Sequence, residues 1–182
     1  LYQTCADSPG PPTLRHAPPM NRPLVSVITP AYNSARFLPQ TIASVRAQTL
    51  GDWVMLFVDD CSTDTTLELA RQAAGADSRI RVLVMNRNGG SGPARNAAIQ
   101  AAAGRYLAFL DSDDLWDSAK LERQVAFMRS DRHAFTYHDY RVISESGARL
   151  GRTLKFPPSI SYRDMLVEQP GNALACSQAF AV

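Results

Sequence analysis

The chain has 182 residues, of which 45% are hydrophobic, and a formal net charge of +2 at pH 7. A chain of this size buries roughly 70% of its unfolded surface, so one domain can fold without disulfide or metal support. The basic residues are nearly all arginines without a basic stripe, which argues against a nucleic-acid partner. No apolar run approaches the ~20 residues of a membrane helix, so we expect no transmembrane segment.

The three cysteines lie far apart and lack metal-ligand spacing, which predicts free thiols in a reducing, cytoplasmic compartment. Residues Leu1–Pro23 are rich in proline and lack apolar periodicity, so they are predicted to be a disordered leader. Residues 24–182 are expected to form a single domain. Because the apolar stretch from Asn172 runs to Val182 without a polar tail, we expect this domain to be cut short at its C-terminal end.

Four continuous apolar runs in the first two thirds of the chain predict buried β-strands. Pro30 is expected to end the first of them. The four predicted strands are Leu24–Thr29, Trp53–Val58, Ile80–Met85 and Tyr106–Leu110.

Helices are predicted between these strands from their start and stop signals. Ser34 is placed to cap the first helix, and Gly75 is placed to end the second. Pro93 suits the first position of the third helix, and Gly104 suits the position just after its end. Strands that alternate with helices in this way are typical of a parallel sheet covered on both faces.

Ligands of parallel sheets bind beyond the carboxyl ends of the strands. Each predicted strand is followed there by polar or glycine-rich residues, which makes a shared site more plausible than any single motif. The four segments are Thr29–Asn33, Asp59–Asp60, Asn86–Gly92 and Asp111–Asp114.

Beyond Trp116 the sequence predicts smaller elements. A helix capped by Ser118 is expected to run to about Arg129, followed by an antiparallel pair, Ala134–Ile143 with Ala148–Phe156. Residues 161–164 have the spacing of a capped short helix.

The stretch LAFLDSDDLW carries an apolar strand into three carboxylates. If the extended geometry continues through Ser112, the side chains of Asp111 and Asp113 leave the same face. Two converging carboxylates suit Mg²⁺ or Mn²⁺, and such a cation could hold a diphosphate. The alternative interpretation is a solvated acidic turn, in which Asp114 caps a helix that starts at Leu115.

Three segments, VSVITPAYNS, FVDDCSTDTT and GPARNAAIQAAAGRYLAFLDSDD, resemble the family 2 glycosyltransferases with the GT-A fold in order and spacing. The resemblance implies an α/β fold whose mostly parallel nucleotide-binding sheet is sandwiched by helices, with antiparallel additions toward the C-terminus. It also implies inverting transfer of a sugar from a nucleotide diphosphate sugar, most often a UDP-sugar, to a hydroxyl acceptor. That acceptor is expected to be a saccharide or a lipid-linked molecule. A lipid-linked acceptor is compatible with a cytoplasmic protein that contacts the inner face of the membrane peripherally.

The resemblance assigns residues to the donor site. Asp113, and Asp111 directly or through water, would hold Mn²⁺ or Mg²⁺. Tyr32 is expected against the base, and Arg95 near the base or the diphosphate. Asp60 is expected to accept a hydrogen bond from the base while Asp59 fixes the loop, and the reverse assignment stays open. The donor-site set is Pro30, Ala31, Tyr32, Asn33, Asp59, Asp60, Arg95, Asp111 and Ser112.

The catalytic base is missing from this match. An inverting transferase needs a carboxylate that takes the proton from the acceptor hydroxyl, and the resemblance places it beyond Val182. The alternative is therefore a truncated or degenerate member that binds nucleotide sugar without catalysis. Trp116 fits an acceptor-side or a packing role equally, and His138 has no assigned partner.

Other classes that place acids after parallel strands fit less well. A haloacid dehalogenase needs Thr or Val where this chain has Leu115. A receiver domain needs its acid pair after the first strand, and a Rossmann dinucleotide binder needs G-x-G-x-x-G there, where this chain has PAYNS.

Overall fold

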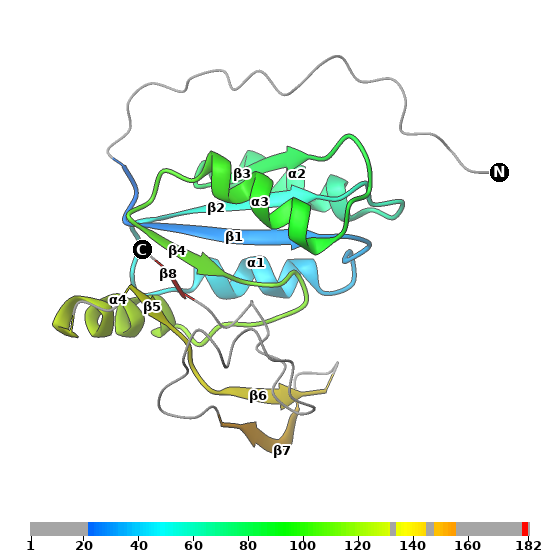
Figure 1. Ribbon diagram of the computed structural model, residues 1–182. Helices are drawn as coiled ribbons and strands as arrows, with labels where there is room; N and C mark the ends of the chain where they lie inside the picture. Colours follow the sequence, from blue (N-terminus) through cyan, green and yellow to red (C-terminus); the bar gives the residue numbers. More distant parts are fainter. Residues whose placement is uncertain (1–21, 132–133, 145–147, 156–179, 182) are drawn as a thin grey trace.

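A six-stranded, mostly parallel sheet forms the body of the protein in this computed structural model (Figure 1). The structure describes residues 22–131, 134–144, 148–155 and 180–181. The strand order of the sheet is β3–β2–β1–β4–β8–β5. Its strands are β1 (Val25–Ala31), β2 (Trp53–Asp59), β3 (Ile80–Val84), β4 (Tyr106–Phe109), β5 (Phe135–Thr136) and β8 (Phe180–Ala181).

The four N-terminal strands run parallel, as the sequence predicted. β1 pairs with both β2 and β4, and β3 pairs with β2. β8 joins the edge in antiparallel pairing with β4 and β5. A separate antiparallel hairpin follows, made of β6 (Tyr140–Ile143) and β7 (Arg149–Leu154). The predicted parallel sheet with antiparallel additions is confirmed, although the segment 134–143 divides between two sheets.

Helices cover both faces of this sheet, because successive strand residues point to opposite sides. Val25, Val27 and Phe57 pack with α1, α2 and α4 in one core, whereas Ile28 and Val58 pack with α3 in the other (Figure 1). The helices are α1 (Leu38–Arg46), α2 (Thr66–Ala76), α3 (Ser91–Ala101) and α4 (Lys120–Asp131).

Pro30 does not end the first strand, which continues to Ala31. The backbone of Ile28, two residues earlier, faces β4 and accepts the N–H of Leu110, so the nitrogen of Pro30 faces the same side. Pairing with β4 stops at Ile28, while pairing with β2 continues to Ala31. The missing N–H of Pro30 therefore costs no ladder hydrogen bond.

Three predicted helix boundaries are also wrong. Gly75 lies inside α2, which runs on to Ala76. α3 begins at Ser91, so Pro93 is its third residue. The structure places the backbone of Gly104 against β1, where its N–H donates to Ser26 Oγ over 2.9 Å. A Cβ at this position would lie 2.5 Å from the Ser26 nitrogen, so close approach of two backbones requires this glycine.

The remaining sequence predictions have mixed outcomes. α4 begins at Lys120 after a turn at Asp117, whose carboxylate accepts the Ala119 N–H, so the predicted Ser118 cap is wrong. Cys61 forms no disulfide within the described residues, and its thiol donates to the Met85 carbonyl over 3.1 Å; the other two cysteines lie outside the described residues. The leader 1–23, save its last two residues, and the short helix predicted at 161–164 also lie outside them.

Gly104→Ala should lower the free energy of unfolding by about 1–3 kcal/mol, because the added methyl group meets the β1 backbone. Gly75→Ala is the matched control: apart from the backbone of its own helix and its two chain neighbours, no described atom lies within 4 Å of its Cβ position, and alanine in a helix should raise stability by roughly 0.5–1 kcal/mol. Urea unfolding of both variants measures the difference. Equal effects of the two substitutions would contradict the packing argument.

Candidate functional site

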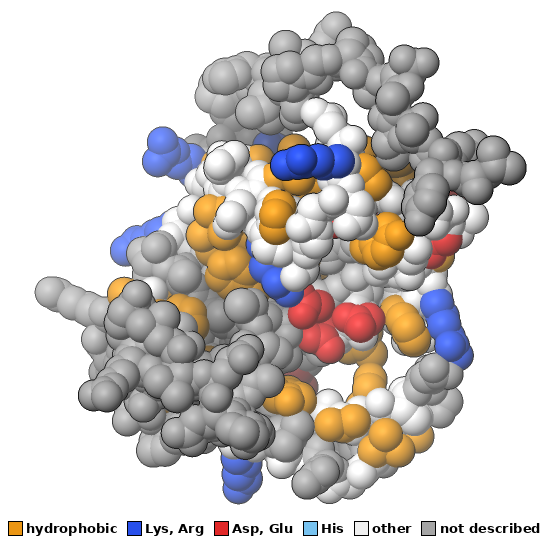
Figure 2. Space-filling model, turned by 45° about the vertical axis from the view of Figure 1, so that its right-hand side comes forward, with side chains coloured by type: hydrophobic (Ala, Val, Ile, Leu, Met, Phe, Trp, Pro, Cys, Tyr) orange, Lys and Arg blue, Asp and Glu red, His pale blue; other side chains and the backbone are white. Residues whose placement is uncertain are grey.

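A cleft of about 430 Å³ opens at the carboxyl ends of β1, β2 and β4, beside the start of α3. We call it the first cleft. Figure 2 shows a group of acidic side chains near the centre of the face presented there. The residues that line the first cleft are Pro30, Ala31, Tyr32, Ser34, Asp60, Asn88, Gly90, Ser91, Ala94, Arg95, Asp111, Ser112 and Asp113.

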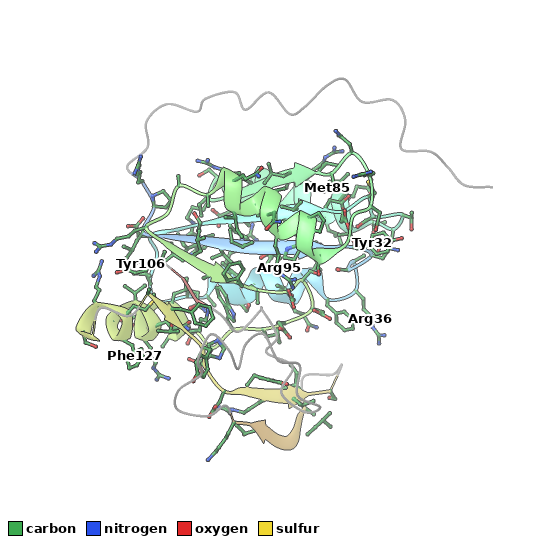
Figure 3. The ribbon with its side chains drawn as sticks, viewed as in Figure 1. Tyr32, Arg36, Met85, Arg95, Tyr106 and Phe127 are labelled. Atoms are coloured by element: carbon green, nitrogen blue, oxygen red, sulfur yellow. The ribbon has the colours of Figure 1, made fainter. Side chains whose placement is uncertain are left out.

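Tyr32 stands beyond the carboxyl end of β1 (Figure 3) with half of its side chain exposed. Asn33, which the sequence also assigned to the site, does not line the first cleft. Its backbone has a positive φ of 50°, and its side-chain oxygen accepts the N–H of Thr63 over 2.8 Å. Asn33 thus ties the end of β1 to the segment before α2.

The two carboxylates after β2 organise different segments. Asp60, only 2% exposed, accepts the N–H of Gly89 and, over 2.6 Å, that of Gly90. Asp59 accepts the N–H of Ser62 over 3.1 Å and does not line the first cleft. The bonds that shape the glycine loop therefore come from Asp60, whereas Asp59 fixes its own turn.

Arg95 connects α3 to the strand end after β4. Its Nη2 donates to Asp111 Oδ1 over 2.6 Å, and its Nη1 donates to Ser91 Oγ over 3.1 Å. The Arg95 side chain is 18% exposed and that of Asp111 30%. The Nε of Arg95 is buried and has no hydrogen-bond partner among the described residues. Figure 3 shows Arg95 on the side of α3 that faces the strand ends.

The acidic segment after β4 is a turn. The N–H of Asp114 donates to the carbonyl of Asp111 over 3.1 Å, so the extended geometry assumed for Asp111 and Asp113 is wrong. Both carboxylates nevertheless line the first cleft. No helix starts at Leu115, so the predicted cap by Asp114 is also wrong.

A hydroxyl network that sequence reasoning missed holds this turn. Ser34 Oγ lies 2.7 Å from Ser112 Oγ instead of capping α1, and Thr41 Oγ1 donates to the Ser112 carbonyl over 2.9 Å. Ser34 N donates to Thr66 Oγ1 over 2.7 Å. All four side chains are buried. The only sequence signal was the hydroxyl of Thr41 on the apolar stripe of α1.

The carboxylates of Asp111 and Asp113 have the donor chemistry that Mn²⁺ and Mg²⁺ prefer. Among the described residues, no cluster of three or more His, Cys, Asp or Glu side chains suited to a metal occurs. A cation held here would thus take its remaining ligands from waters or phosphate oxygens, which is usual for Mg²⁺. The residues present fit such a cation.

A larger second cleft, of about 940 Å³, adjoins the first and shares Asp113 with it. Trp116, 8% exposed, packs in the core and also lines this second cleft. Lys120 Nζ lies 3.6 Å from the centre of the Trp116 ring, and burial lowers the pKa of Lys120 well below its ordinary value. His138 lines the same cleft.

The fold and first cleft define a class: an α/β protein that gathers carboxylates and an arginine at the carboxyl ends of parallel strands. The model of the family described as Glycosyl transferase family 2 matches residues 26–182. The chain belongs to this family.

Curated relatives agree with this assignment. The chain is 43% identical over 145 residues to the "Putative teichuronic acid biosynthesis glycosyltransferase TuaG" of Bacillus subtilis, covering 80% of this chain and 58% of the relative. It is 38% identical over 143 residues to the UDP-Glc:alpha-D-GlcNAc-diphosphoundecaprenol beta-1,3-glucosyltransferase WfgD of Escherichia coli, covering 79% and 55%. The chain therefore spans a little over half the length of these relatives.

Solved structures confirm the GT-A fold. The S. aureus TarS fragment 1–349 in complex with UDP matches with a TM-score of 0.58 and 32% identity, over 61% of this chain and 33% of that one. The mannosyltransferase PcManGT of Pyrobaculum calidifontis matches with a TM-score of 0.60 and 24% identity, over 68% and 36%, which shows the fold alone. Within the part that the structure describes, none of the helices has the length and apolar character to cross a membrane.

Thr41→Val should lower the free energy of unfolding by about 1–3 kcal/mol, because it removes the buried hydroxyl that holds the Ser112 carbonyl. Thr49→Val is the control, since Thr49 also donates from its hydroxyl, over 2.7 Å to Glu122, but at an exposed position. That change should stay within about 0.5 kcal/mol. Chemical unfolding measures both; a cost for Thr41→Val no greater than for the control would contradict a structural role of this network.

Proposed function

We propose that the chain forms the donor-binding part of an inverting glycosyltransferase that transfers a sugar from a UDP-sugar to a hydroxyl acceptor. The observation that carries the proposal is the first cleft, which brings Asp60, Arg95, Asp111 and Asp113 together at one sheet edge. TarS, a structural relative at 32% identity, has been solved with UDP and with UDP-GlcNAc, which supports a uridine nucleotide.

The end of the first cleft beside Tyr32 suits the nucleoside. The ring of Tyr32 is half exposed, so one face is open for a base to stack. Asp60 lines the cleft, and among the described residues its Oδ1 accepts only the Gly89 N–H, so this oxygen has a second acceptor site, whereas Oδ2 already accepts the N–H groups of Gly89 and Gly90. Asp60 can therefore accept a ring N–H of uracil while it keeps that loop in place.

The other end of the first cleft suits the diphosphate and its cation. Asp113 and Asp111 would hold Mn²⁺ or Mg²⁺, which stabilises the negative charge that grows on the leaving diphosphate. Asp111 is already paired with Arg95. Donor binding would exchange these partners: the guanidinium turns to the phosphate oxygens, and Asp111 becomes free to face the cation.

The acceptor is proposed to be a saccharide, carried on a lipid at the inner face of the membrane. The support is the name of WfgD, whose acceptor is a GlcNAc-diphosphoundecaprenol. The carboxylate base that takes the acceptor proton is proposed to lie beyond Val182. We accordingly propose a cytoplasmic location with peripheral contact at the membrane surface, with the lipid-linked acceptor named for WfgD as support.

Asp113→Asn should weaken binding of UDP in the presence of Mn²⁺ at least about tenfold, because the cation loses a charged ligand. Isothermal titration with and without Mn²⁺ measures the effect. Asp52→Asn is the matched control, since Asp52 is exposed and precedes β2 at the opposite end of that strand.

The UDP titrations also help to distinguish the proposed transferase from a protein that binds nucleotide sugar without catalysis. UDP binding that requires Mn²⁺ in the wild type and is lost in Asp113→Asn supports the donor site. Binding without transfer to any acceptor by the full-length protein would favour the non-catalytic alternative. Failure of the wild type to bind UDP, with or without metal, would refute both.

Arg95→Gln should shift the two affinities in opposite directions. UDP binding should weaken about tenfold, because a charged donor to phosphate is lost. Binding of Mn²⁺ alone should strengthen, because Asp111 no longer has an ion-pair partner. Paramagnetic titration with Mn²⁺ and calorimetry with UDP measure the two values, with exposed Arg71→Gln on α2 as the control. Weakening of both affinities would contradict the partner exchange.

A further inference from the structure

The proposed donor site occupies the first cleft, and the second cleft, which adjoins it, has no role assigned so far. It lies between the acidic turn after β4, the start of α4 and the β6–β7 hairpin, and Asp113 lines both clefts. Figure 1 shows this hairpin set apart from the main sheet, on the α4 side. A molecule in the second cleft would therefore sit next to the diphosphate end of the donor site.

His138 places a hydrogen-bond acceptor at this cleft. Its Nδ1 lies 2.8 Å from the carbonyl oxygen of Asp139. Because a carbonyl can only accept, Nδ1 carries the proton and Nε2 carries the lone pair. Nε2 is buried and has no hydrogen-bond partner among the described residues. A buried acceptor without a partner is costly, which suggests that a ligand supplies its donor.

The surroundings of His138 keep the imidazole neutral. Burial lowers the pKa of His138, and the nearby charge of Lys120 lowers it further, against an opposing contribution from Asp139. The charged or titratable groups that line the cleft from the other packed elements are Asp113, Asp114, Asp117, Tyr140 and Arg141.

The lining of the second cleft favours a neutral ligand. Four carboxylates face it against the basic side chains of Lys120 and Arg141, so a phosphate or carboxylate ligand would be repelled. Tyr140, which is partly exposed, adds aromatic surface, which suits the apolar face of a sugar ring. A ligand that combines such a face with hydroxyl donors is a neutral saccharide.

We propose that His138 Nε2 accepts a hydrogen bond from a hydroxyl group of a neutral saccharide acceptor in the second cleft, and so positions that sugar beside Asp113. The proposal rests on the transferase function proposed above and assigns its acceptor side. His138 is a positioning residue here. Burial lowers the pKa of the imidazole, so the hydroxyl proton is not transferred to it.

Two amide substitutions separate this role from a purely structural one. The amide nitrogen of Asn can replace Nδ1 as the donor to the Asp139 carbonyl, but Asn has no atom at the place of Nε2. The amide of Gln reaches the place of Nε2 and can supply an acceptor oxygen there, but it loses the bond to Asp139. Ligand positioning predicts that His138→Gln is tolerated and His138→Asn is not, while a structural role predicts the reverse.

The experiment titrates the protein, saturated with UDP and Mn²⁺, with the methyl α-glycosides of N-acetylglucosamine, glucose and galactose. Calorimetry gives the affinities, and ¹⁵N NMR follows the imidazole nitrogens of the wild type. We expect at least one glycoside to bind and to shift the Nε2 resonance of His138. His138→Asn should weaken this binding about fivefold, the loss of one hydrogen bond, whereas His138→Gln should stay within about twofold. UDP affinity should be unchanged in both variants.

Three results would overturn the inference. A wild-type affinity in His138→Asn together with weakened binding in His138→Gln would assign His138 to the turn alone. Normal UDP binding without binding of any glycoside would remove the acceptor assignment and leave the donor site intact. Glycoside binding that leaves the Nε2 resonance unmoved in the wild type would exclude the hydrogen bond without reliance on a variant. Failure of the wild type to bind UDP would instead refute the proposed function itself.

Discussion

The site depends on the parallel alignment of β1 with its two neighbours. Val25 is paired with Trp53 on one side and with Tyr106 on the other, so β1, β2 and β4 start level. Because all three run in the same direction, their carboxyl ends point to one edge of the sheet, although β4 ends three residues before β1 and β2. The residues that follow them, Asp60 and Asp111 among them, are therefore brought into one cleft although about fifty residues separate them in sequence.

That alignment brings several carboxylates together, and the negative charge of each one is compensated in a different way. Asp60 is almost fully buried and is satisfied by backbone N–H groups, so it needs no counter-ion. Asp111 is partly exposed and pairs with Arg95. Asp113 is exposed, where water screens its charge. Because Asp113 is the most exposed of the three, it is the carboxylate that a cation reaches most easily. Asp111 becomes available to a cation once Arg95 binds another anion.

The sequence predicted the sheet because continuous apolar runs need burial on both faces, and it located the site because the strand ends of a parallel sheet converge. Details governed by contacts distant in sequence were missed. Pro30 continues its strand because its neighbour β4 has already ended, and Ser34 bonds Ser112 across 78 positions rather than capping α1. Gly104 carries a helix-stop signal but serves the approach of two backbones. No local pattern encodes these partners, so local rules selected the commoner alternative.

The same reasoning explains why His138 could not be assigned from sequence. Its tautomer depends on the adjacent Asp139 carbonyl, and its lowered pKa depends first on burial and then on the charge of Lys120, which follows a different strand. Only the folded chain brings these groups to a cleft that shares Asp113 with the first cleft. Asp113 thus borders two clefts of different character: the first is proposed to bind a diphosphate and its cation, and the second has mostly acidic charges in its lining. A polar, uncharged sugar ring suits the second cleft, because it adds no charge next to the carboxylates that line it.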